Sequence, residues 1–283
     1  MRRLAQTKRS LWQALIFALL AQASNQAMCD ETIAEPTDRA GRDPIGIEAG
    51  YVYTQGKYSS TVESKSTVKN LTLSWTAFDM DFQFTTLYLE RTAPAGTIIA
   101  RVKKVVTVTP RIVSSSGAGD LSLSVNKEIF TDPATAIAVN AVGEMKIATA
   151  DSAKGLGTGK NDYTVGLTAS YPFETAVVSG GAKYSVLGDP GKIKVNGIVE
   201  DIRFNNIWSG YFAFTTELTS RSNATFSFNM AQPSGTATNY YQVLELATSY
   251  RFSEAASLRI FTSKGTNQNS PDWSAGLVLS GNF

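Results

Sequence analysis

The sequence predicts an all-β fold, a single transmembrane antiparallel β-barrel of about 12 strands, within a range of about 10 to 14. Three observations predict it: the chain starts like a secreted protein, alternates apolar and polar residues along most of its length, and ends on an aromatic residue. In residues 273–283, apolar or small residues hold every second position, which is the period of a β-strand, and Phe283 closes this face. Such an ending is typical of bacterial outer-membrane barrels.

The first 23 residues have the three parts of a secretory signal peptide. Residues 1–10 carry four basic residues and no acidic one, residues 11–21 are apolar apart from Gln13, and Ala21-Gln22-Ala23 is an A-x-A cleavage pattern. The apolar run is shorter than the roughly 20 residues of a transmembrane helix. We therefore expect a cleaved signal peptide over 1–23, a flexible periplasmic leader over 24–43 and an outer-membrane barrel over 44–283.

Between the ends, segments with a period of two follow one another in order. The clearest are 163–171 and 223–230, where aromatic and aliphatic residues alternate with Thr, Ser, Asn and Gly. The candidate strands lie near 45–54, 71–77, 81–91, 98–109, 121–126, 136–148, 163–171, 176–187, 208–214, 223–230, 244–252, 256–264 and 273–283. These are about 13 candidates, whereas closed barrels of this type prefer an even number. We settle on 12, because either 98–109 belongs to a long extracellular hairpin or 45–54 is poorly formed.

Aromatic residues and turns favour a barrel over a soluble β-sandwich. Tyr163 and Tyr171 sit at the two ends of one apolar face, and Trp273 and Phe283 do so on the last strand, as expected for the aromatic belts of a membrane barrel. The segments 131–135, 172–175 and 254–256 are short turns, and 148–162, 231–239 and 263–272 are longer and rich in Gly and Ser. The short turns would be periplasmic, and the longer loops would face outward.

Charged residues also occur on the predicted inner face. As candidates for lining the lumen we take Glu128, Glu144, Lys146, Lys183, Glu245, Arg251 and Arg259. Such charges either tune the selectivity of a pore or are paired wall residues that hold the barrel in shape.

Several other functions lack support. The chain has no His, the base that a hydroxyl nucleophile normally requires, so we expect no catalytic residues, and it has no metal-binding spacing and no implied cofactor. The segment around Gly155, Gly157, Gly159 and Lys160 departs from a phosphate-binding loop in spacing and lacks the Ser or Thr, which favours an ordinary loop. Cys29 follows Met28 rather than a small residue, which favours an inert thiol over a lipid anchor. Without the signal peptide the chain is close to neutral, so no nucleic-acid partner is expected.

Four stretches resemble a bacterial outer-membrane family labelled as the MetA pathway of phenol degradation, or SphA-like transporters. They are 117–125 (GAGDLSLSV), 143–167 with its GLGTG and Asp-Tyr, 180–190 (GGAKYSVLGDP) and the terminal hairpin 263–283. The sequence departs from the family where Ala148-Thr149-Ala150-Asp151 replaces Pro-Thr-Gly-Asp and where Gly281 replaces an aromatic residue. The resemblance implies a barrel of the 12-stranded type that helps apolar or aromatic compounds cross the outer membrane.

The sequence therefore favours a channel for passive uptake of hydrophobic or aromatic small molecules. A general polar-solute porin and a structural or adhesive barrel with a closed lumen are the alternatives. The expected partners are outer-membrane lipid, apolar small molecules and the barrel-assembly machinery, which would bind the terminal strand.

Overall fold

Twelve strand positions close into an antiparallel barrel, which confirms the predicted fold class and strand number. The computed structural model describes residues 45–57, 63–94, 112–189, 191–195, 198–234 and 240–283. The predicted signal peptide, the leader, Cys29 and the segment 98–109 lie outside these ranges. The strands of the barrel are β1 (Ile45–Gly56), β2 (Ser64–Ala77), β3 (Met80–Pro94), β5 (Leu121–Thr131), β6 (Ala138–Ile147), β7 (Asp162–Pro172), β8 (Ala176–Val186), β11 (Ile207–Thr219), β12 (Ser222–Ala231), β13 (Tyr241–Ser253), β14 (Ala256–Gly265) and β15 (Trp273–Asn282).

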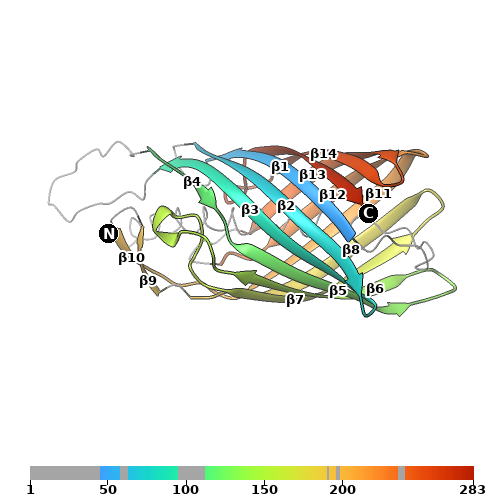
Figure 1. Ribbon diagram of the computed structural model, residues 1–283, viewed down its shortest axis with the longest axis horizontal. Coiled ribbons are helices and arrows are strands. Elements are labelled where there is room, and N and C mark those ends of the chain that lie inside the picture. The colour runs from blue at the N-terminus through green and yellow to red at the C-terminus, as the bar shows by residue number, and fades with distance from the viewer. Residues whose placement is uncertain (1–44, 58–62, 95–111, 190, 196–197, 235–239) are drawn as a thin grey trace.

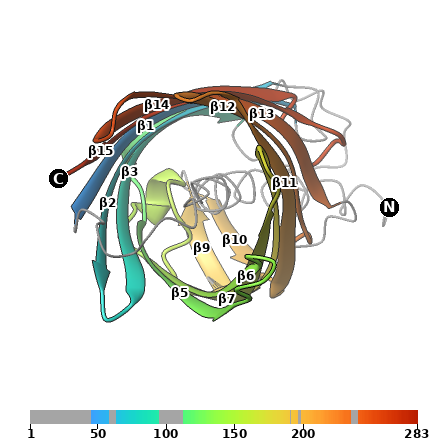
Figure 2. The ribbon, with the colours of Figure 1, turned by 90° about the vertical axis from the view of Figure 1, so that its right-hand side faces the viewer.

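The barrel closes between the first and the last strand. β1 pairs with β15 from Gly46 opposite Asn282 to Gln55 opposite Trp273, and with β2 on its other side. One end of the barrel carries the short turns between strands, and we call it the short-turn end. Seen from this end, the strands form a closed ring (Figure 2), and from the side they are strongly tilted (Figure 1). The suggestion that 45–54 is poorly formed is therefore wrong, because this segment is a full strand that completes the ring.

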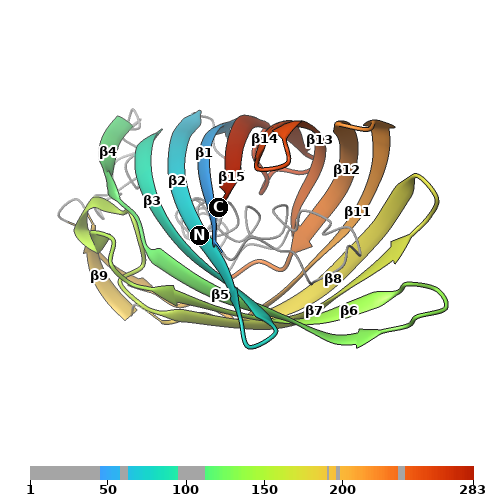
Figure 3. The ribbon, with the colours of Figure 1, turned by 45° about the vertical axis from the view of Figure 1, so that its right-hand side comes forward.

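One position of the barrel is shared by two strands. Residues 88–94 of β3 pair with β4 (Ile112–Ala118), and residues 81–85 of β3 pair with β5. The register changes by one residue between them, since Tyr88 faces Ala118 whereas Thr85 faces Ser122. Gly119 and Asp120 form this break, and β4 leads through it into β5 beside β3 (Figure 3). A one-residue insertion of this kind is a β-bulge, which bends a strand and redirects side chains.

The two faces of the wall differ in the way that the alternation predicts. The outer face carries large apolar side chains that are exposed, among them Leu167 (53% exposed), Phe212 (50%), Leu246 (57%) and Ile260 (52%). The inner face carries mostly Ser, Thr, Asn, Gly and charged residues. In a soluble protein such an apolar exterior would be anomalous, whereas in a membrane lipid would cover it without cost.

Aromatic pairs on the outer face lie near both ends of the barrel. Trp75 stacks on Phe82 at the short-turn end, with ring centroids 5.4 Å apart, and Tyr171–Phe173 and Tyr250–Phe252 pair at the same end. At the long-loop end the pairs are Tyr53–Trp273 and Tyr184–Trp208. Two aromatic girdles at the ends of an apolar band are characteristic of strands that cross lipid.

The connections alternate in length between the two ends. At one end the turns are short, such as Phe78–Asp79 between β2 and β3 and residues 173–175 between β7 and β8. At the other end lie the longer segments 148–161 and 266–272, together with a small hairpin of β9 (Gly191–Val195) and β10 (Ile198–Ile202) that the sequence analysis did not predict. Among the described residues, no helix is both long and apolar enough to span a membrane.

A testable feature of the short-turn end is the pKa of Asp132. Thr135 Oγ1 donates to its carboxylate at 2.5 Å and the Ala134 N–H donates at 3.1 Å, and these bonds, the Thr135 bond foremost, hold the pKa of Asp132 below its ordinary 3.8. The stabilisation of the turn is present above the unfolded-state pKa and is lost as the pH falls through the lowered folded-state pKa. The amide chemical shift of Ala134, followed by NMR during acidification, should therefore titrate below the pH of a free Asp. A Thr135→Ala variant should raise the midpoint, and an unchanged midpoint would contradict this assignment.

Candidate functional site

The seven charged residues predicted to line the lumen all lie at inward-facing positions of their strands. Four ion pairs account for five of them: Lys183–Glu144 at 2.7 Å, Arg259–Glu245 at 2.6 Å, Lys146–Asp162 at 2.7 Å and Lys146–Asp120 at 3.2 Å. Glu128 lies toward the short-turn end of β5. Arg251 lies at the same end of β13 and donates to the Ser220 carbonyl at 3.0 Å. The structure therefore does not gather the seven residues into one ring.

An apolar patch crosses one half of the inner wall, among polar residues of the same strands. Val52, Val68, Leu89, Ala247, Phe261 and Val278 come from β1, β2, β3, β13, β14 and β15 and form one buried cluster together with Leu156. These six strands are consecutive around the barrel, so the apolar residues form a continuous patch, which we call the apolar wall. The opposite strands β5 to β8 carry Ser122, Ser124, Thr164, Thr168 and the ion pairs of Lys146 and Lys183.

The segment 148–161, between β6 and β7, folds into the barrel. Leu156 is only 3% exposed, and the Arg91 guanidinium donates to the Gly155 carbonyl at 3.1 Å. A Cβ atom on inward-facing Gly117 would lie 2.8 Å from Leu156 Cδ1, so the leucine packs directly on β4. Figure 2 shows this segment and its 3-10 turn η2 (Ser152–Lys154) inside the ring. The segment lies at the long-loop end, as expected from its length, but it turns into the bore instead of extending outward, which the sequence did not indicate.

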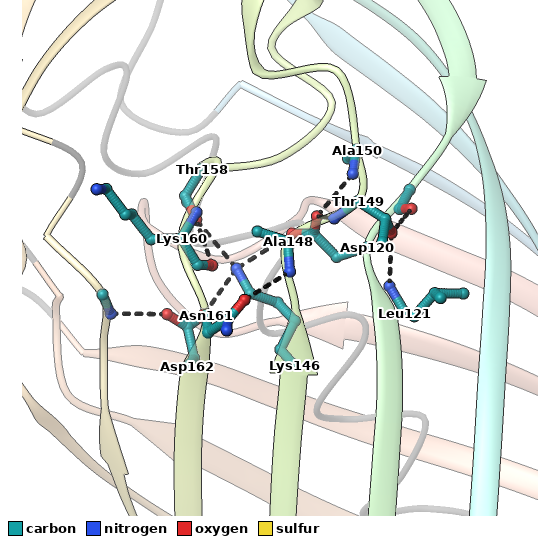
Figure 4. Close-up of polar contacts among 12 residues, drawn as sticks. Asp120, Leu121, Lys146, Ala148, Thr149, Ala150, Thr158, Lys160, Asn161 and Asp162 are labelled. Atoms are coloured by element: carbon teal, nitrogen blue, oxygen red, sulfur yellow. Dashed lines mark hydrogen bonds and ion pairs between the residues drawn. The ribbon is translucent and has the colours of Figure 1, made fainter.

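A buried polar network fixes both ends of this inward loop (Figure 4). Lys146, the last inward-facing residue of β6, contacts Asp120, Asp162 and the Thr158 hydroxyl, the last at 3.1 Å. Asp120 Oδ1 also accepts the N–H groups of Thr149 and Ala150 at 3.1 and 3.0 Å. At the return of the loop, Asn161 Oδ1 accepts the Ala148 N–H at 2.9 Å. The side chains of the three ionic residues are 8–12% exposed, so these contacts are shielded from water.

Local sequence explains how the loop can turn so tightly. Asp151 caps η2 by accepting the N–H groups of Ala153 and Lys154. Gly155 and Gly159 have φ values of 70° and 69°, a region that strongly favours glycine. A side chain at Gly157 would collide with Ala150 and Asp120. The glycines thus serve the turn geometry, as expected for an ordinary loop rather than a phosphate-binding one.

Sequence reasoning missed four residues of this site: Arg91, Asp120, Leu156 and Asp162. Asp162 could have been found, because it has the same parity as the polar Thr164 and Thr168 and lies directly opposite Lys146. Asp120 lies in the strand break, where parity gives no guidance. In the described ranges, no group of three or more His, Cys, Asp and Glu side chains could hold a metal ion.

The predicted belt residues lie on the outer face at the ends of their strands. Tyr163 and Trp273 are at the long-loop end and are 51% and 40% exposed, and Tyr171 and Phe283 are at the short-turn end and are 40% and 72% exposed. The Phe283 N–H donates to the Ile45 carbonyl at 2.9 Å, which continues the β1–β15 pairing to the last residue.

Comparisons with known proteins show the fold. No protein-family model and no curated protein matches the chain, so the family resemblance stays a prediction. An outer membrane channel from Pseudomonas putida F1 is similar with a TM-score of 0.64 and 14% identity, over 88% of this chain and 100% of that one. The translocator domain of the autotransporter NalP from Neisseria meningitidis has a TM-score of 0.58 and 11% identity, over 93% and 97%. The NanC porin has a TM-score of 0.53 and 11% identity, over 84% and 100%.

Proposed function

We propose that this chain is a bacterial outer-membrane channel for passive passage of small molecules with an apolar or aromatic part. The observation that carries this proposal is the apolar wall, which occupies six adjacent strands of a barrel whose inner face is otherwise polar. The wall residues are only 3–8% exposed, so an aromatic solute would gain free energy by burying its own apolar surface there, at roughly 25 cal/mol for each Å² removed from water. A sugar gains nothing there and loses water contacts of its hydroxyls.

The outer face supports a membrane location. Exposed Leu, Ile and Phe side chains form a band between two aromatic girdles, and the twelve strand positions close into a ring, so that only β4, at the long-loop end, has an edge without a partner strand among the described strands of the barrel. The solved proteins that share this fold include one described as an outer membrane channel and one described as a porin, which agrees with this location.

The pairing of the inner charges supports an apolar rather than an ionic solute. The Lys183–Glu144 and Arg259–Glu245 pairs are neutral as units, so they contribute little net field along the bore. A selective ion pore instead uses rings of like charge. The stretches around 117–125 and 143–167 that resemble the phenol-degradation family are in line with the same substrate class, and we propose membership of that family.

Permeation into liposomes that carry the mature protein tests the function. Phenyl β-glucoside and cellobiose are a suitable pair, because both contain a β-glucosyl unit and differ in whether a phenyl ring or a second glucose is attached to it. Their hydroxyls keep both from crossing protein-free lipid quickly. We expect the phenyl glucoside to enter faster. Equal rates would indicate a general porin, and no entry of either would indicate a structural barrel closed by its inward loop.

A further inference from the structure

We propose that Lys146, with Asp120 and Asp162, is the positioning residue of a selectivity constriction formed by the inward loop 148–161. The role of Leu156 as the loop's contribution to the apolar wall rests on the proposed function. The role of the three charges in holding the loop is a separate claim about geometry. Lys146 contacts side chains from three places in the chain: the strand break, the loop and the first residue of β7.

The position of the three charges explains why the loop turns inward. β4 has no partner strand on its far side, because β6 ends at Ile147 and pairs only with β5 and β7. The bulge at Gly119–Asp120 places the Asp120 carboxylate beside the first loop residues, where it accepts the N–H groups of Thr149 and Ala150. The chain leaving β6 is thus drawn to the inner side of β4 rather than outward.

The charge balance makes Lys146 the central group. Its ammonium lies between two buried carboxylates and also donates to Thr158, whose own side chain is 3% exposed. Removing one member of a buried ionic cluster leaves an uncompensated charge, whereas replacing all members with neutral groups of similar shape is often tolerated. The triple variant D120N/K146M/D162N therefore removes the ionic contacts without burying an unpaired charge.

The result of this positioning is the location of Leu156. The Arg91–Gly155 bond and the packing of Leu156 on Gly117 bring the leucine to the inner side of β3 and β4, where it extends the apolar wall into the bore. A loop released from this place would uncover the apolar residues on which Leu156 packs and widen the bore. Lys146 thereby determines solute size and polarity without touching the solute.

Trypsin sensitivity in detergent micelles tests the positioning directly, because a folded protease is too wide to enter a 12-stranded barrel. Lys154 and Lys160 are the cleavage sites in the loop. In D120N/K146M/D162N we expect cleavage after them, mapped by mass spectrometry, to accelerate at least about tenfold, the factor that accompanies loss of one charge-assisted hydrogen bond. The matched control E144Q/K183M removes a buried ion pair on the inner face of β6 and β8, outside the loop. This variant should keep the protection of the wild type.

Barrel formation is checked by heat-modifiable gel migration. If the triple variant does not form a barrel, Thr158→Val removes the hydroxyl that Lys146 binds, together with its two bonds to the Lys160 backbone, and should still raise cleavage. Thr164→Val, which removes a hydroxyl bonded to Ser185, should not. Protection of the loop in an intact D120N/K146M/D162N barrel would overturn the proposal, and so would equal cleavage in the E144Q/K183M control. Cleavage does not depend on any solute. If cleavage accelerates in the triple variant as expected but the wild-type channel shows no preference for the aromatic solute, only the proposed function is contradicted.

Discussion

Replacing Leu246 with Arg should destabilise the folded barrel by about 2–4 kcal/mol, the range for a charge near the bilayer midplane. Leu246 lies in the middle of β13 on the outer face, is 57% exposed and faces Phe226 of β12. In water an exposed Leu→Arg change would cost almost nothing. In lipid the guanidinium must be desolvated or drawn toward the interface.

Phe252→Arg is the matched control, since Phe252 lies on the same face of the same strand at the short-turn end and is 51% exposed. There the cost should be about 0–1 kcal/mol, because the depth in the membrane is smaller. Reversible unfolding by guanidinium in liposomes measures both values. Equal costs at the two positions would mean that this face does not contact a membrane.

Deleting the last strand, residues 273–283, should abolish barrel formation altogether. β15 pairs with both β1 and β14, so its loss exposes two rows of unpaired backbone groups. Each such group costs several kcal/mol in lipid, and the ring has no other way to close. Heat-modifiable gel migration after refolding into liposomes measures the outcome, and a barrel formed without these residues would contradict the observed topology.

Deleting Phe283 alone gives a contrasting expectation. Its side chain is 72% exposed and its N–H makes one backbone bond, so refolding of the purified protein should change little. If the terminal strand is what the barrel-assembly machinery binds, the amount of this variant in the outer membrane of cells should fall sharply. Normal levels in cells would argue against that partner.

The strands and their two faces could be predicted because their signal is local. In 163–171, for example, Val165 and Leu167 alternate with Thr164 and Thr168. Alternation with a period of two residues shows directly which residues share a face. Even the uncertain first strand follows this pattern, although Gly46 and Gly50 weaken it.

The site could not be predicted in the same way, because its residues become neighbours only in the folded barrel. Val52, Val68 and Val278 are each a single large apolar residue on the inner face of a strand, and they form a patch only when six strands are placed side by side. The inward turn of the loop depends on contacts of Asp120 and Asp162 with Lys146, from separate segments of the chain. Alternation carries no information about such contacts.

The most direct test of the channel's preference is to change the polarity of the apolar wall while keeping its shape. In V68T/V278T each Val is replaced by a side chain of similar volume, and V142T, at an inward position of β6 outside the apolar wall, is the control. We predict that entry of phenyl β-glucoside into liposomes falls by about fourfold, the factor that corresponds to roughly 0.8 kcal/mol for one buried methylene equivalent, while cellobiose entry does not fall. The V142T channel should keep the wild-type ratio of the two rates. An unchanged ratio in V68T/V278T, or an equal loss for both solutes, would contradict an apolar path through this barrel.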